Sequence, residues 1–121
     1  MENGYKRTGA DMKLIKAIIK PERLDTVKKG LEDIGIYGMT ISEVQGRGEQ
    51  KGIALQYRGG TIQVDVISKI EIDIIVKNSD KQKVIETIIA NAKTGKIGDG
   101  RIFVLPVEES IKIRTEEVIT E

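Results

Sequence analysis

A loop near the C-terminal end of the chain combines glycines with charged side chains in an order that suits anion binding. Residues 94–101 (TGKIGDGR) precede a run of β-forming residues at 102–104 (IFV). Glycine lets backbone N–H groups turn toward a bound group and approach it closely, and lysine and arginine supply charge for phosphate. A glycine-rich hairpin turn with solvated charges would have the same composition. These residues alone leave both alternatives open.

Composition limits what the rest of the chain can do. The 121 residues fit one domain, and although 32% are charged the formal net charge is only +1. A general nucleic-acid binder usually has a strong basic excess, and 3% aromatic residues do not make a base-stacking platform. The chain has no cysteine and no histidine, which removes disulfides, thiolate metal sites and the commonest general base. The sequence therefore predicts no nucleic-acid partner.

Recognised catalytic and nucleotide motifs do not fit. Residues 94–101 lack the earlier glycine and the Ser or Thr of a Walker motif, and residues 46–52 (GRGEQKG) miss the spacing of the dinucleotide fingerprint. The carboxylate pairs Glu71/Asp73 and Glu108/Glu109 fit a solvated strand face and a charged chain end better than acid–base catalysis. We therefore predict a binding protein with no catalytic residues, and not an enzyme.

Hydrophobic periodicity predicts four strands and two helices. The strands are expected at 14–20, 39–45, 70–76 and 102–107, where β-branched or alternating residues dominate. The first helix is expected to begin at Pro21 and to end at Gly35, and the second to begin with a capping box formed by Ser79 and Gln82. The apolar positions of the two helices recur at steps of three and four: Leu24, Val27, Leu31 and Ile34, then Val84, Ile85, Ile88, Ile89 and Ala92.

Three segments fall outside this regular pattern. Residues 1–11 are polar and are expected to be a disordered extension or a cloning remnant, with a single domain at 12–121. Residues 46–66 are expected to form a long, mobile, hairpin-like loop, and loops of this length are usually functional. Residues 108–121 form a charged C-terminal segment. No apolar run is long enough to span a bilayer, and residues 1–11 have no signal-peptide centre, so we expect a cytoplasmic protein.

The order strand–helix–strand occurs twice, on either side of the long loop. A duplicated βαβ unit is typical of the ferredoxin-like α+β fold (βαββαβ), with an antiparallel four-stranded sheet and both helices on one face. The glycine loop, residues 93–101, is the extra stretch that distinguishes the second half from the first. Because a helix-to-strand connection needs only a few residues, its length and charge favour a functional role.

The sequence resembles the nitrogen-regulatory PII signalling proteins of the GlnB/GlnK type, and most closely the archaeal GlnK-like members. The resemblance covers residues 13–115 and is carried by 17–21 (AIIKP), 38–40 (GMT), 46–52 (GRGEQKG), 57–59 (YRG), 94–104 (TGKIGDGRIFV) and 113–115 (IRT). It implies a homotrimer that binds ATP or ADP in the three clefts between neighbouring subunits. The glycine loop would line that cleft, in agreement with the phosphate-binding interpretation above.

The resemblance also implies particular binding residues. Those for the nucleotide are Ile18, Gly38, Thr40, Gly48, Gln50, Asp73, Ile75, Ile97, Gly98, Asp99, Gly100, Arg101, Lys112 and Arg114. Those for 2-oxoglutarate are Gln50, Lys51, Gly52, Lys69 and Gly98, with Gln50 also joining Mg²⁺ to the ATP phosphates. Within the first set Arg101 stands where the family usually has lysine, Lys112 where it usually has arginine, and Asp73 where it often has glutamate.

The long loop is the segment that the resemblance assigns to partner binding. Lys51, Tyr57 and Arg58 would contact an ammonium transporter, the expected partner and the means of any peripheral membrane association; glutamine synthetase and nitrogenase are the other expected targets. Two positions depart from the family. The tyrosine that is uridylylated in relatives is Ile62 here, so no uridylylation is expected, and Glu49 replaces an arginine that normally reaches the phosphates. A weak ATPase and a metal-binding or purely structural trimer remain the alternatives.

Overall fold

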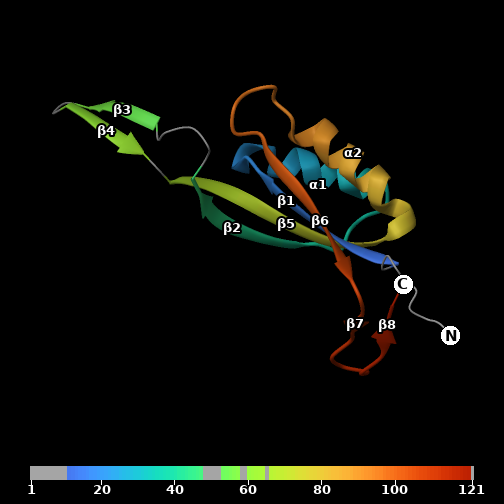
Figure 1. The fold of residues 1–121 in the computed structure, drawn as a ribbon. Helices are drawn as coiled ribbons and strands as arrows, with labels where there is room; N and C mark the ends of the chain where they lie inside the picture. The colour runs from blue at the N-terminus through green and yellow to red at the C-terminus, as the bar shows by residue number, and fades with distance from the viewer. Residues whose placement is uncertain (1–10, 48–52, 58–59, 65, 121) are drawn as a thin grey trace.

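The computed structural model describes residues 11–47, 53–57, 60–64 and 66–120, which form a four-stranded sheet with two helices packed on one face (Figure 1). The sheet strands are β1 (Met12–Ile19), β2 (Thr40–Gly46), β5 (Ile67–Lys77) and β6 (Gly100–Val107). The helices are α1 (Leu24–Asp33) and α2 (Lys81–Ala92), each preceded by a short 3-10 turn, η2 (Pro21–Arg23) and η3 (Asn78–Asp80).

The strand order β2-β5-β1-β6, with every neighbouring pair antiparallel, is the ferredoxin-like arrangement expected from the duplicated βαβ pattern. Strand β1 lies in the interior of the sheet, where Ile18 pairs with Glu71 of β5 on one side and with Arg101 of β6 on the other. The register therefore brings the C-terminal end of β1, the middle of β5 and the start of β6 side by side.

The hydrophobic core lies between the sheet and the helices. Alternate residues of β1 and β5 point toward the helices because side chains alternate across a strand. The core side chains with almost no exposed surface are Ile15, Ala17, Val27, Leu31, Ile72, Ile74, Val84 and Ile88. Helix α1 ends as predicted, because Gly35 adopts a φ of 87° and the N–H of Ile36 bonds the Leu31 carbonyl at 2.9 Å.

The opposite side of the sheet, which we call the open face, is not covered by either helix (Figure 1). It carries a charged cluster in which Lys16 Nζ lies 2.8 Å from Glu71 Oε2 and 3.7 Å from Asp73 Oδ1. The hydrogen bond from Lys16 lowers the pKa of Glu71, whereas burial and the neighbouring Glu71 raise the pKa of Asp73. Half-exposed Ile75 adds an apolar side chain to the same face.

Two details of the second half differ from the sequence-based predictions. The capping box at Ser79 and Gln82 is wrong, because Ser79 lies inside η3 and the helix starts after Asp80 with no side-chain cap. Gln82 Nε2 instead donates to Glu86 Oε2 at 3.2 Å along the helix. The segment after β6 forms a small hairpin of β7 (Ser110–Ile111) and β8 (Val118–Ile119), which the pattern at 108–121 did not predict.

Between β2 and β5 the chain forms the hairpin of β3 (Ile53–Tyr57) and β4 (Gly60–Val64). Figure 1 draws this hairpin beyond the end of the sheet where β2 finishes and β5 begins. The antiparallel pairing agrees with the hairpin expected within residues 46–66. Residues 48–52, 58–59 and 65, like 1–10 and 121, lie outside the described residues, and the mobility of the segment stays a prediction.

Candidate functional site

The glycine loop connects the end of α2 to the start of β6, where the backbone approaches β1 very closely. Gly100 pairs with Ile19, and a Cβ at position 100 would lie 1.8 Å from the carbonyl oxygen of Ile18. The φ of Gly100 is also 112°, a conformation that side-chain-bearing residues rarely adopt. Glycine is therefore required here for both space and backbone conformation.

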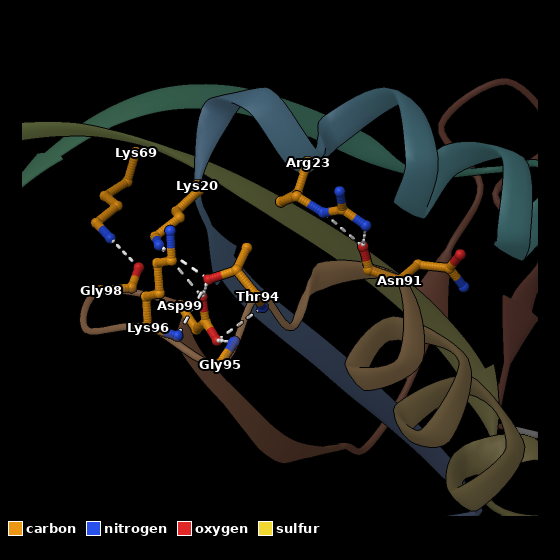
Figure 2. A network of polar contacts seen from close by, with 9 residues as sticks. All are labelled: Lys20, Arg23, Lys69, Asn91, Thr94, Gly95, Lys96, Gly98 and Asp99. Atoms are coloured by element: carbon orange, nitrogen blue, oxygen red, sulfur yellow. Dashed lines mark hydrogen bonds and ion pairs between the residues drawn. The ribbon is translucent and has the colours of Figure 1, made fainter.

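Asp99 organises the inside of the loop (Figure 2). Its carboxylate accepts hydrogen bonds from the backbone N–H of Thr94 at 2.9 Å, from the N–H of Gly95 at 2.8 Å and from the Thr94 hydroxyl. Thr94 Oγ1 also accepts the N–H of Lys96 at 3.2 Å. The hydroxyl and backbone donors hold the pKa of Asp99 far below its usual range. The loop thus has internal hydrogen bonds that fix its shape.

Two side chains from the junction between β1 and α1 bind the glycine loop and the end of the helix before it (Figure 2). Lys20 Nζ donates to Thr94 Oγ1 at 3.1 Å and lies 3.3 Å from Asp99 Oδ1. Arg23 donates from Nε at 2.9 Å and from a terminal guanidinium nitrogen at 2.6 Å to the carbonyl oxygen of Asn91, in the last turn of α2. These bonds attach both the helix end and the loop to the C-terminal end of β1.

Lys69 attaches the middle of the loop to β5. Its ammonium group donates to the carbonyl oxygen of Gly98, and a Cβ at Gly98 would lie 3.4 Å from Lys69 Nζ. Because β5 pairs with both β1 and β2, this bond ties the loop to the interior strands of the sheet.

Beside the loop lies a cavity of about 540 Å³, a size typical of small-molecule sites. Its lining residues are Ile18, Gly46, Arg47, Lys69, Lys96, Ile97, Gly98, Asp99, Gly100, Arg101 and Phe103. Four of them are cations and one is a carboxylate, so the cavity favours an anion. Half-exposed Phe103 and exposed Ile97 add apolar surface, which suits a ligand with both an anionic and an apolar part.

Seven residues predicted from the sequence meet at this cavity: Ile18, Lys69, Ile97, Gly98, Asp99, Gly100 and Arg101. The prediction missed Gly46, Arg47, Lys96 and Phe103. Phe103 could have been found, because strand alternation places it on the same face as Arg101, two residues before it. Lys96 lies within the predicted loop itself. The contribution of Arg47 depends on how the end of β2 meets β5, which the sequence pattern does not specify.

A second group of predicted residues lies further along the open face. Thr40 pairs with Asp73, and both are near the start of β2 rather than its end. Asp73 is four residues along β5 from Lys69, roughly 13 Å, and Thr40 is six residues along β2 from Gly46, roughly 20 Å. Ile75 and Gly38 extend this group still further from the loop. One chain does not bring these residues into the cavity.

A third group, Lys112 and Arg114, belongs to the C-terminal hairpin at the opposite end of β6 (Figure 1). Strand β6 spans roughly 23 Å between the glycine loop and the hairpin. Lys112 Nζ lies 3.5 Å from Glu117 Oε1 within that hairpin. Within a single chain these cations are therefore well separated from the loop.

The remaining predicted residues carry no structural result. Gly48, Gln50, Lys51, Gly52 and Arg58 lie outside the described residues. Tyr57 and Ile62 belong to the paired strands β3 and β4, and nothing is described of their side chains. In the part of the chain that is described, no three His, Cys, Asp or Glu side chains are grouped to hold a metal ion, and no helix is long and apolar enough to cross a membrane.

Residues 12–117 match the family model described as Nitrogen regulatory protein P-II, which spans the sheet, both helices and the glycine loop. The chain belongs to the P-II family. A P-II protein named Nitrogen regulatory protein P-II 2, from the archaeon Methanothermobacter thermautotrophicus, is 50% identical over 106 residues, covering 88% of this chain and 92% of the relative. The P-II protein of Microchaete diplosiphon is 48% identical over 110 residues, covering 91% and 98%.

A solved P-II structure has the same fold. The crystal structure of Arabidopsis thaliana PII bound to citrate superimposes with a TM-score of 0.72 at 37% sequence identity, covering 90% of this chain and 86% of that one. The P-II family and the ferredoxin-like fold expected from the sequence are thereby confirmed. The family is one of nitrogen regulatory proteins, which act through effectors and partner proteins.

Replacing Gly100 with alanine tests the close approach of the loop to β1. We expect Gly100→Ala to lower the free energy of unfolding by roughly 1–3 kcal/mol, because the added Cβ meets the Ile18 carbonyl and the φ is unfavourable. Urea unfolding at one fixed protein concentration measures it. Gly38→Ala is the matched control, since nothing lies within 4 Å of its Cβ position. Equal stability of the two variants would contradict the strand contact.

Proposed function

We propose that this P-II protein is a non-enzymatic sensor that binds ATP or ADP in clefts between the subunits of a homotrimer. Nucleotide state, together with Mg²⁺ and 2-oxoglutarate, selects the conformation of the segment at 46–66, and that segment binds a partner protein. An ammonium transporter is the expected partner, and glutamine synthetase or nitrogenase the other candidates. The cavity beside the glycine loop is the observation that carries this proposal.

The chemistry of the cavity supports a nucleotide. Lys69, Lys96 and Arg101 supply positive charge for a polyphosphate, and the loop supplies backbone groups that approach without a side chain between them. Apolar Ile18 and Phe103 lie on the same face of the sheet and provide a surface for a flat ring. A ligand with several negative charges at one end and an apolar ring at the other uses both parts.

The separation of the predicted residues supports an inter-subunit site. Arg114 and Thr40 each lie too far from Gly98 to reach one ligand within a single chain, by the strand lengths above. A neighbouring copy can present its own C-terminal hairpin and the far end of its open face to the loop. The half-exposed apolar residues of the open face, including Ile75 and Leu105, suit burial in such an assembly.

The proposed binding of Mg²⁺ and 2-oxoglutarate depends in part on residues of the long loop. Gln50 would join the metal to the ATP phosphates, and Lys69, beside Gly98, would pair with a carboxylate of the 2-oxo acid. The Arabidopsis relative was solved with citrate, itself a small polycarboxylate, which supports an acid effector. Glu49 argues against an acid effector, because a carboxylate directed at the phosphates would repel both ATP and 2-oxoglutarate.

Regulation fits the site better than ATP hydrolysis does. Asp99 is the one carboxylate among the described residues that line the cavity, and its low pKa makes it a weak proton acceptor. Its oxygens are already used by Thr94, Gly95 and Lys20. These properties favour a structural role for Asp99, and hence nucleotide binding without turnover.

Calorimetric titration with ATP and with ADP, each with and without Mg²⁺, tests the proposed function. The wild-type protein should bind both, and Arg101→Ala should weaken binding about ten- to hundredfold by removing a cation from the phosphate site. Lys83→Ala, which removes an exposed cation from α2, should leave the affinity unchanged. Absence of binding by the wild-type protein would reject the proposal.

Mixed trimers test whether the site is shared between chains. Trimers with Arg101→Ala on some subunits and Arg114→Ala on the others should regain high-affinity sites, because a loop with intact Arg101 can face a hairpin with intact Arg114. Trimers composed of either variant alone provide the control. If mixing restores no site, the two arginines do not act on one nucleotide from neighbouring chains.

A single substitution tests the effect of Glu49 on the 2-oxo acid. Glu49→Arg should strengthen 2-oxoglutarate binding in the presence of Mg²⁺ and ATP by about tenfold or more, because a repelling charge becomes an attracting one. The readout is a titration of 2-oxoglutarate into the nucleotide-loaded protein. Glu43→Arg, on strand β2, introduces the same charge change elsewhere. Unchanged affinity in Glu49→Arg would show that Glu49 does not limit acid binding.

A further inference from the structure

Lys20, the residue between β1 and η2, is directed at Thr94 and Asp99 of the glycine loop (Figure 2). Its ammonium group contacts Thr94 Oγ1 at 3.1 Å and Asp99 Oδ1 at 3.3 Å. The Lys20 side chain is only 17% exposed and that of Asp99 25%, so water screens this ion pair less than a surface pair. Lys20 is also absent from the described residues that line the cavity, whereas Asp99 is among them.

The position of Asp99 creates a problem that Lys20 can solve. Asp99 brings a negative charge to the wall of a cavity whose other charges are positive. Its carboxylate is nonetheless needed there, because it holds the N–H groups of Thr94 and Gly95 at the start of the loop. A cation behind the carboxylate offsets its charge and leaves the hydrogen bonds in place.

We propose that Lys20 is a positioning residue of the glycine loop: through Thr94 and Asp99 it holds the loop in its binding conformation before any ligand arrives. This inference rests on the proposed nucleotide site and adds to it a residue that acts on the ligand indirectly. A loop that is ordered in advance loses less conformational entropy on binding, so the affinity for an anion is higher.

A second contact from the same junction supports this role. Arg23, three residues after Lys20, binds the Asn91 carbonyl with two N–H groups and so fixes the end of α2 just before the loop. Lys20 then fixes the loop itself, at Thr94 and Asp99. The β1–α1 junction therefore contacts the chain just before the loop, at its start and near its end.

Lys20→Met, which keeps the aliphatic chain but removes the charge, tests the proposal. In the ligand-free protein, amide hydrogen exchange at Thr94 and Gly95 should become about tenfold faster, because their acceptor Asp99 loses its partner. ADP affinity measured by calorimetry should fall about tenfold. Lys83→Met removes the same charge from an exposed position on α2, away from the loop, and should change neither quantity.

A double-variant comparison separates positioning from direct contact with the phosphates. If Lys20 acts through Asp99, adding Lys20→Met to Asp99→Asn should lower the ADP affinity little further. The salt dependence of ADP binding by Lys20→Met alone should match that of the wild-type protein. If Lys20→Met lowers the ADP affinity equally in the wild-type protein and in Asp99→Asn, and also reduces the salt dependence of ADP binding, Lys20 is a phosphate ligand and the proposal is overturned.

The exchange measurement keeps this test apart from the proposed function. Unchanged exchange at Thr94 and Gly95 in Lys20→Met would overturn the positioning role even if the wild-type protein binds ADP well. Faster exchange in a protein whose wild-type form binds no nucleotide would support the positioning role and reject nucleotide sensing. Thermal unfolding of each variant verifies that the fold is retained, and Asp99→Asn alone should also accelerate exchange at the same two amides.

Discussion

Strand β1 lies between β5 and β6 and pairs with both in antiparallel register, and the positions of the glycine loop, Arg101 and Lys69 follow from that double pairing. It places the end of β1 beside Arg101 on one side and near Lys69 on the other. The loop that enters β6 must therefore cross the end of β1, at a distance where position 100 accommodates glycine alone. Once the loop crosses there, Lys20 and Arg23 are close enough to hold it. The site is thus a consequence of the sheet register as much as of its own residues.

The length of β6 explains why one chain holds only part of the predicted site. The glycine loop and the C-terminal hairpin lie at opposite ends of β6, and no adjustment of side chains closes that distance. The open face, with its cluster of Lys16, Glu71 and Asp73, lies between them without a covering helix. The proposed assembly of copies would account for both features together, because a neighbour could cover the open face and supply these cations.

Much of the fold could be predicted from the sequence, because its strands and helices carry strong periodic patterns. Alternation around Ile72 and Ile74 defines the buried face of β5, and the spacing of Val27 and Leu31 defines the buried side of α1. The capping box predicts the start of α2 too early, because Ser79 lies inside a 3-10 turn and such turns have no distinct sequence pattern. The β7–β8 hairpin was missed because two-residue strands are too short to show alternation.

The candidate site could be predicted only in part. The type and spacing of the loop's glycines and cations indicated anion binding without excluding a plain turn. The seven predicted residues that meet at the cavity were named by the family resemblance. Lys20 could not be recognised from its own neighbours, since its partner Thr94 lies 74 residues later in the chain and meets it only after the sheet has formed. The distances between Thr40, Arg114 and the glycine loop within one chain could not be predicted either, because a sequence motif gives the order of residues and not the distances between them.

The most direct test of the proposed shared site is a crystal structure of the protein grown with ADP. We expect the phosphates to lie within hydrogen-bonding distance of the backbone N–H groups at Gly98 and Gly100 of one subunit. Arg114 of a neighbouring subunit should contact the same ADP molecule. An ADP molecule bound away from the glycine loop, or one held entirely by a single chain, would contradict this account.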